Sequence, residues 1–91
     1  MIRSCRDKEV QRLLDRKFSR RWQALERTAR IRLALLDAAT SLGDLRLPGL
    51  RLEALKGDRD GQHSIRINDQ FRICFEWRAG DAYNVEIVDY H

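Results

Sequence analysis

The sequence of 91 residues predicts a single α+β domain, residues 1–91, in which two helices pack on one face of a mainly antiparallel sheet. Three observations support this prediction. Apolar residues recur at helical spacing up to about residue 39, they alternate with polar residues from residue 50 onward, and turn signals divide this second part into short segments. A chain of this length forms one two-layered core but no deep cavity. We therefore expect any site to be a shallow surface groove.

The first part of the chain predicts a short strand and two helices. Residues 2–5 suit the strand, and Asp7 is a suitable N-cap for a first helix. The apolar positions of the first helix are Val10, Leu13, Leu14 and Phe18. Those of the second helix, which should end near residues 39–43, are Trp22, Leu25, Ala29, Leu33 and Leu36. After this helix, Pro48 and Gly49 indicate a loop.

The second part predicts a meander of four strands. The alternating segments are about residues 51–55, 63–67, 71–77 and 83–87. The turns between them fall at residues 57–61, 68–69 and 79–81, which contain Gly, Asp or Asn. Because consecutive strands joined by short turns pair antiparallel, the two helices should cover one face of the resulting sheet.

The charge of the chain is uneven. The formal net charge is +4, with 18 Lys and Arg against 14 Asp and Glu. Residues 1–36 carry 11 basic and 4 acidic side chains, a net charge of +7, whereas residues 37–91 carry 7 and 10, a net charge of −3. A concentration of positive charge on one part of a small protein favours a polyanionic partner. The alternative is an ordinary solvated face rich in arginine.

Several classes of protein are not expected. Cys5 and Cys74 are too few and too far apart for a disulfide framework or a zinc site with four close ligands, and we expect reduced thiols. We expect no metal and no cofactor. The longest apolar stretch, Leu33–Leu36, is far shorter than the roughly 20 residues of a membrane span. We therefore expect a soluble cytoplasmic protein.

Two cationic residues are candidates for phosphate binding. Alternation places Arg72 on the polar face of its strand, where its guanidinium either binds a phosphate or forms a cross-strand ion pair with Glu53 or Glu86. Lys56 lies at the end of a strand, directly before the turn that begins at Gly57, so its ammonium group should be exposed.

Histidine is the side chain best suited to proton transfer near neutral pH, and the chain has two. We expect a structural role for His63, at the start of a strand. His91 closes the chain beside Asp89 and Tyr90. This cluster follows a strand rich in β-forming residues, so it is a candidate for catalysis.

Two motifs are specific when they occur together: Leu-Lys-Gly-Asp-Arg at residues 55–59 and the closing Asp-Tyr-His at residues 89–91. Further matching segments are residues 2–4, 38–40, 51–54, 60–61, 64–67, 71–73 and 80–83. With these segments the chain resembles, over essentially its whole length, the HigB (host inhibition of growth) toxins of the RelE/ParE superfamily.

This resemblance implies a RelE/ParE-like fold and a toxin of a type II toxin-antitoxin system. Such a toxin enters the A site of the 30S ribosomal subunit and cuts messenger RNA, and a HigA-like helix-turn-helix antitoxin neutralises it. By carry-over, the terminal catalytic cluster is Asp89, Tyr90 and His91, and the basic positions near the scissile phosphate are Lys56 and Arg72. Where some relatives have a histidine, this chain has Glu53. Either Glu53 or His91 is then the general base. Cys5 stands where relatives often carry an aromatic residue, and this difference should affect packing only.

The residue types fit RNA cleavage by the 2′-hydroxyl without a metal, since this needs a base, cationic groups and an acid. We expect His91 as acid or base, Asp89 as its partner, and Tyr90 stacked on or hydrogen-bonded to the nucleotide. The basic helices should contribute to ribosome binding through Arg20, Arg21, Arg27 and Arg30. Two alternatives remain: a gyrase poison of the ParE type, and a non-catalytic module that binds nucleic acid or protein.

Overall fold

The computed structural model describes residues 1–89, and two helices in it follow from the sequence pattern. Helix α1 spans Lys8–Leu14, and the Asp7 side chain caps it by accepting a hydrogen bond from the backbone N–H of Val10. Helix α2 spans Glu26–Ala38 and follows a 3₁₀ turn, η1, at Gln23–Leu25. Phe18 lies beyond α1 and is exposed, so the first helix is shorter than the apolar spacing suggests.

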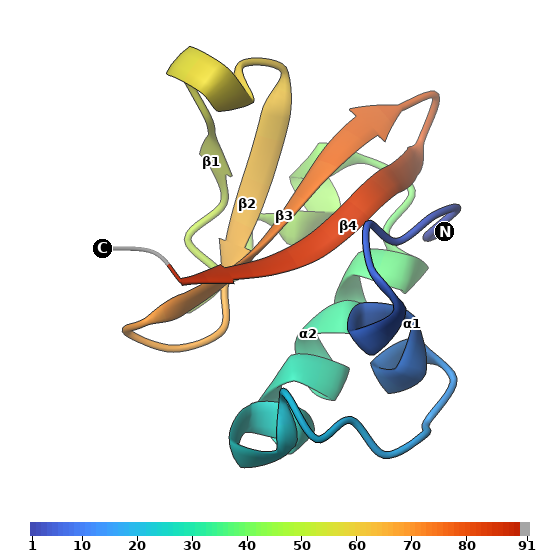
Figure 1. Ribbon diagram of the computed structural model, residues 1–91. Helices are drawn as coiled ribbons and strands as arrows, with labels where there is room; N and C mark the ends of the chain where they lie inside the picture. The colour runs from blue at the N-terminus through green and yellow to red at the C-terminus, as the bar shows by residue number, and fades with distance from the viewer. Residues whose placement is uncertain (90–91) are drawn as a thin grey trace.

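Four antiparallel strands form one sheet in the order β1-β2-β3-β4. They are β1 (Glu53–Ala54), β2 (Gln62–Arg66), β3 (Phe71–Arg78) and β4 (Asp81–Asp89). The two helices lie together beside the sheet, and β1 forms its far edge (Figure 1). The predicted meander is therefore confirmed, although β1 has two residues where five were expected. Arg51 has a φ of 46°, a left-handed conformation that prevents an extended strand at that point.

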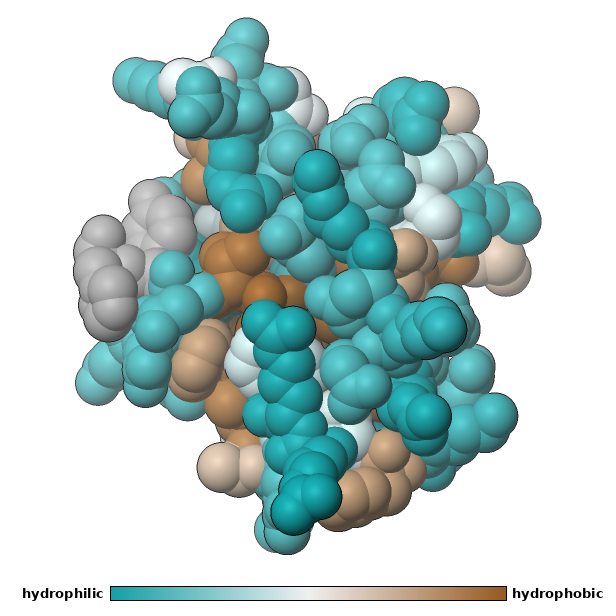
Figure 2. All heavy atoms as spheres, viewed as in Figure 1, coloured by the Kyte–Doolittle hydropathy of each residue, from teal (hydrophilic) through white to brown (hydrophobic). Residues whose placement is uncertain are grey.

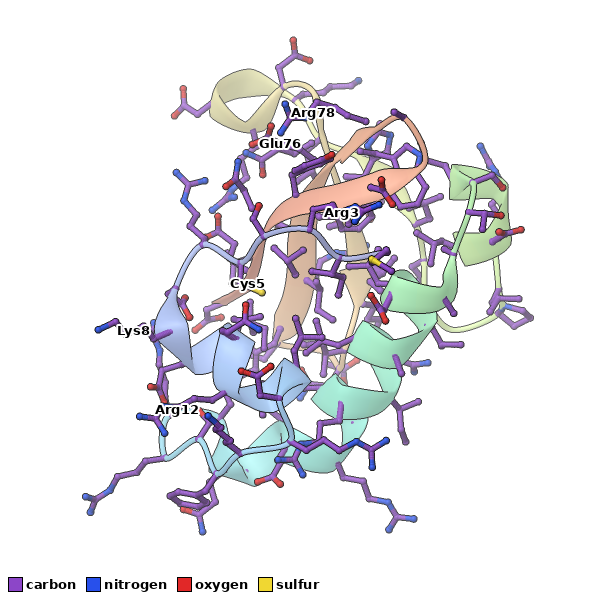
Figure 3. All side chains as sticks on the ribbon, turned by 90° about the vertical axis from the view of Figure 1, so that its right-hand side faces the viewer. Arg3, Cys5, Lys8, Arg12, Glu76 and Arg78 are labelled. Carbon is purple, nitrogen blue, oxygen red and sulfur yellow. The ribbon has the colours of Figure 1, made fainter. Side chains whose placement is uncertain are left out.

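The prediction of an N-terminal strand at residues 2–5 is wrong. Residues 2–5 make two isolated parallel bridges to β4, Ile2 with Ala82 and Cys5 with Val85, instead of a continuous ladder. Between these partners Asn84 adopts a φ of 52° and donates its backbone N–H to the Ser4 hydroxyl. A left-handed residue in β4 interrupts the regular ladder. The segment nevertheless runs along β4, as Figure 3 shows around Arg3 and Cys5.

The core lies between the helices and one sheet face. Ala29, Leu33 and Leu36 form the buried side of α2, at the spacing that the sequence predicted. They face alternate, fully buried residues of the strands, which include Ile65, Ile73, Phe75 and Val85. Trp22 is also buried, with its ring edge-on to Phe71 at 5.4 Å between centroids. Because this apolar layer occupies one face, the polar residues of the same strands point to the other.

Candidate functional site

The open face of the sheet, opposite the helices, carries a row of polar side chains. Strand register places Glu53 of β1 beside Ser64 of β2, Ser64 beside Cys74 of β3, and Cys74 beside Glu86 of β4. Ser64 and Cys74 are buried, whereas the Glu53 side chain is about half exposed. The register therefore makes this row polar, and Glu53 makes it accessible at the β1 edge. Hydrophilic residues also cover most of the molecular surface in the view of Figure 2, where hydrophobic ones show mainly near the centre.

Arg72 is held within this face by several acceptors. Its Nε donates to the Ser64 hydroxyl at 2.8 Å, and its Nη2 donates to the backbone carbonyl of Arg51. Its Nη1 lies 3.8 Å from Glu53 Oε1, and 7% of its side chain is exposed. Of the two cross-strand ion pairs that the sequence left open, the structure therefore shows the one with Glu53. A guanidinium fixed in this way presents a positive charge with little freedom to move.

Arg72 and Glu53 line a shallow groove of about 220 Å³. Its lining residues are Arg51, Glu53, Arg66, Asn68, Asp69 and Arg72. Arg66 pairs in register with Arg72 and forms an ion pair with the exposed carboxylate of Asp69. Sequence reasoning missed Arg66, although the alternation of Ile65 and Ile67 with it places its side chain on the same face as Arg72. Three guanidinium groups thus surround one opening.

A second groove, of about 400 Å³, adjoins the first at Glu53. It is lined by Glu53, Ala54, Leu55, Lys56 and Arg59. Lys56 is exposed, as predicted, and lies directly before the 3₁₀ turn η3 (Gly57–Arg59). Since Glu53 borders both grooves, the structure brings together three of the six predicted catalytic residues: Glu53, Lys56 and Arg72.

The other three predicted catalytic residues come from the end of the chain. Asp89 is the last residue of β4 and pairs in register with Phe71, next to Arg72 in β3. Its carboxylate accepts a hydrogen bond from the Gln70 amide at 3.1 Å. Tyr90 and His91 lie outside the described residues. β4 therefore ends at the same end of β3 as Arg72.

Glu86, at the far end of the polar row, is bound by two arginines. Its Oε2 accepts from Arg6 at 3.1 Å and from Arg59 at 3.4 Å. The hydrogen bond to Glu86 raises the pKa of Arg59 above its usual value. Burial raises the pKa of the neighbouring Cys74 thiol, so this group is protonated at neutral pH. Sequence reasoning also missed Arg59, because it gave the motif Leu-Lys-Gly-Asp-Arg a role only at its lysine.

The predicted ribosome-binding arginines lie in the helical layer, away from both grooves. Arg20 and Arg21 precede η1, and Arg27 and Arg30 belong to α2. Arg21 stacks over the Trp22 ring at 5.0 Å, while Arg30 pairs with Glu26 at 2.6 Å and donates to the carbonyl of Lys17. In the same layer, Lys8 and Arg12 extend outward from α1 (Figure 3). The four predicted ribosome-binding arginines therefore lie on a surface separate from the grooves, whereas Arg3 and Arg6 pair with carboxylates of β4.

His63 has surroundings that agree with the structural role expected for it. Its half-buried ring stacks on Phe75, with the centroids 6.2 Å apart. Within residues 1–89 no group of three or more His, Cys, Asp or Glu side chains is arranged to hold a metal ion. No helix in that same range is long and apolar enough to cross a membrane. Both cysteines are free, Cys74 buried and Cys5 half-buried.

Two helices on a four-stranded antiparallel sheet, with a basic groove on the open face, are compatible with the class of RelE-like toxins. A family model described as "RelE-like toxin of type II toxin-antitoxin system HigB" matches residues 3–91. The chain therefore belongs to the HigB-like toxin family, which confirms the resemblance found in the sequence.

Two curated relatives carry the family name. The chain is 43% identical over 60 residues to the endoribonuclease HigB of Proteus vulgaris, a match that covers 66% of this chain and 65% of the relative. It is 48% identical over 54 residues to the toxin HigB-1 of Vibrio cholerae, which covers 58% and 57%. The matched segments thus span less than two thirds of either relative's length.

Proposed function

We propose that this toxin is a ribosome-dependent endoribonuclease that cuts messenger RNA and so inhibits translation and growth. The observation that carries the proposal is the pair of grooves that meet at Glu53. They place the cations of Lys56, Arg66 and Arg72 in the two grooves that share the carboxylate of Glu53 on the open sheet face. The name of the Proteus vulgaris relative, an endoribonuclease, supports the same activity.

The proposed reaction uses the RNA's own 2′-hydroxyl as nucleophile. A general base takes the 2′-hydroxyl proton, the oxygen attacks the adjacent phosphorus, and the bond to the 5′-oxygen breaks as an acid gives that oxygen a proton. The products are a 2′,3′-cyclic phosphate and a 5′-hydroxyl. Glu53 or His91 serves as base, Asp89 contributes from the end of β4, and the family resemblance adds Tyr90 as a group that contacts the nucleotide. What supports Glu53 as the base is its position, since it borders the groove with its carboxylate about half exposed.

The cations stabilise the charge that grows on the phosphate. Lys56 and Arg66 have side chains that reach solvent, so they can contact the phosphate oxygens directly. Arg72 lies deeper and is fixed by Ser64 and the Arg51 carbonyl, so its charge is already oriented before RNA binds. Preorganised charge of this kind costs no rearrangement during the reaction.

The partners that we propose are the A site of the 30S ribosomal subunit and a HigA-like helix-turn-helix antitoxin. Both grooves are shallow, so they hold a flexible RNA strand poorly. A ribosome that fixes the strand supplies the missing orientation, a term worth about 7–11 kcal/mol in well-oriented systems. The arginines of the helical layer would contact ribosomal RNA. A toxin that acts on ribosomes works in the cytoplasm.

The test compares programmed ribosomes with free messenger RNA at equal toxin concentration. We expect rapid cleavage on the ribosome and little cleavage of the naked strand. Equal cleavage of both would contradict the ribosome dependence. Absence of any cleavage, combined with inhibition of DNA gyrase supercoiling, would favour the ParE-type alternative instead.

A further inference from the structure

We infer that Arg59 is a positioning residue, which fixes Lys56 at the groove by tying the turn that follows it to β4 through Glu86. The inference rests on the proposed function, in which Lys56 contacts the scissile phosphate. Arg59 itself need not touch the RNA. Its effect passes through Glu86 on one side and the backbone of the turn on the other.

The contacts of Arg59 span the sheet. Its Nη1 donates to Glu86 Oε2 at 3.4 Å and to Gln62 Oε1 at 3.1 Å. Glu86 belongs to β4, whereas Arg59 lies in the connection between β1 and β2, at the opposite edge of the sheet. The Glu86 side chain is 16% exposed and the Arg59 side chain 37% exposed, so the pair is partly shielded from solvent. A shielded ion pair holds its geometry better than an exposed one.

The turn has few other ties. Within it the Arg59 N–H donates to the Lys56 carbonyl at 3.3 Å, and the Asp60 N–H donates to the Gly57 carbonyl at 3.1 Å. Gly57 and Gly61 both have positive φ values, 66° and 88°, a left-handed conformation that glycine adopts without strain in tight turns. On its N-terminal side, Lys56 follows the buried Leu55, whose N–H donates to the Gln62 carbonyl of β2 at 2.8 Å, and an edge strand of only two residues. These bonds fix the shape of the turn and hold its start against β2, whereas the contact of Arg59 with Glu86 ties the turn to β4.

Arg6 offers a matched control. It binds the same Glu86 oxygen at 3.1 Å but comes from the N-terminal segment, and its hydrogen bonds go to β4, to Glu86 and to the Val85 carbonyl. Removal of either arginine takes one positive charge from Glu86. Only removal of Arg59 frees the turn that carries Lys56.

The first measurement is single-turnover cleavage on programmed ribosomes, with the variants Arg59→Ala, Glu86→Ala, both together, Arg59→Lys and Arg6→Ala. We expect Arg59→Ala and Glu86→Ala each to lower the cleavage rate constant about 10- to 100-fold, the size of effect that a misplacement of roughly 1 Å produces. Ribosome affinity should stay within about twofold. The double variant should be no slower than either single one, because both break the same link. Arg59→Lys should recover much of the rate, and Arg6→Ala should cleave at the wild-type rate.

Additive losses in the double variant, or wild-type cleavage by Glu86→Ala, would overturn the inference. The first result would mean that Arg59 acts on the RNA directly. If Arg6→Ala lowered the cleavage rate constant as much as Arg59→Ala, the charge balance at Glu86 would explain the loss, and the position of the turn would not. Thermal melts of each variant identify those that lose the fold.

The second measurement is amide hydrogen exchange in the free protein. The N–H groups of Leu55 and Arg59 report on the turn, since they donate to the carbonyls of Gln62 and Lys56. They should exchange faster in Arg59→Ala and Glu86→Ala than in Arg6→Ala or the wild type. If the wild type does not cleave RNA but these amides respond as expected, the proposed function is contradicted and the positioning role of Arg59 is supported. If the wild type cleaves RNA but the amides do not respond, the positioning role of Arg59 is contradicted and the proposed function is supported.

Discussion

The guanidinium of Arg72 lies 3.8 Å from the Glu53 carboxylate, and the two side chains differ sharply in exposure, 7% against 48%. The buried partner is also fixed by Ser64 and by the carbonyl of Arg51. The exposed partner borders both grooves on the open sheet face. Arg72 therefore contributes to the fold as well as to the charge of the site, and substitutions can separate these contributions.

Substitution of Arg72 by alanine should lower both stability and activity. It leaves the Ser64 hydroxyl and the Arg51 carbonyl without this donor, at a cost of about 1.5–3 kcal/mol in the free energy of unfolding. Arg66→Ala is the matched variant, because Arg66 pairs with an almost fully exposed Asp69 and its loss should change stability by less than about 1 kcal/mol. Denaturant titrations measure the stability. Both variants should cleave ribosome-bound RNA more slowly, and equal stability of the two would contradict the structural role of Arg72.

Substitution of His91 by alanine should remove most growth inhibition. This prediction rests on the sequence and the family resemblance, which place a proton-transfer group at the end of the chain. Loss of a general acid or base costs about 10²- to 10⁴-fold in rate, whereas we expect stability to change by only about ±0.5 kcal/mol, because we assign His91 a chemical role and no role in packing. Single-turnover cleavage, a thermal melt and binding of the antitoxin separate these effects. Wild-type cleavage by the variant would leave Glu53 as the base.

Charge reversal in the helical layer should weaken ribosome binding. The variant Arg20→Glu with Arg27→Glu removes two exposed cations that lie outside both grooves. Affinity should fall, and the slope of log affinity against log salt should flatten by about one for each lost phosphate contact. Arg30 is left unchanged because its ion pair with Glu26 has a structural role. Reversal of the exposed Arg46, outside this layer, serves as the control, and unchanged binding in the double variant would identify a merely solvated face.

Acid should loosen the N-terminal segment from β4. The hydrogen bond from Arg3, and then that from the N-terminal ammonium group, lower the pKa of Asp81 below its usual value of 3.8. Because the folded pKa is lower than the unfolded one, this contribution to stability is present above the unfolded pKa and is lost as pH falls through the folded one. The melting temperature of Asp81→Asn should therefore depend less on pH below about pH 4 than that of the wild type. Asp58→Asn, at an exposed carboxylate in η3, is the control, and parallel pH curves for all three proteins would contradict the prediction.

The parts of the fold that were predicted from sequence are those with a strong local period. The apolar stripe of Ala29, Leu33 and Leu36 belongs to a real helix, and the alternation through Ile73 and Phe75 belongs to a real central strand. The N-terminal strand was wrong because its pairing depends on the conformation of Asn84, about 80 residues away in the chain. No local pattern reports such a partner.

The candidate site was predictable in part for the same reason. Motif residues identified Lys56 and Glu53, and strand alternation identified the face of Arg72. The Arg72 side chain is held in its buried position partly by the carbonyl of Arg51. Arg51 has a left-handed backbone conformation, which no periodic pattern of apolar residues in the sequence indicates. The link of Arg59 to Glu86 spans 27 positions and joins two edges of the sheet, so a pattern within either segment does not indicate it.

Because Cys74 is buried on the open face of the sheet, the reaction rate of its thiol reports how often that thiol becomes exposed. Its thiol is 1% exposed, and burial keeps it in the unreactive protonated form. In a Cys5→Ser variant, a thiol-directed reagent modifies Cys74 only when the neighbouring side chains of the open face, or the strands themselves, move away from it. The labelling rate then measures how often this thiol is uncovered, and a comparison with and without antitoxin shows whether neutralisation also protects this face of the sheet.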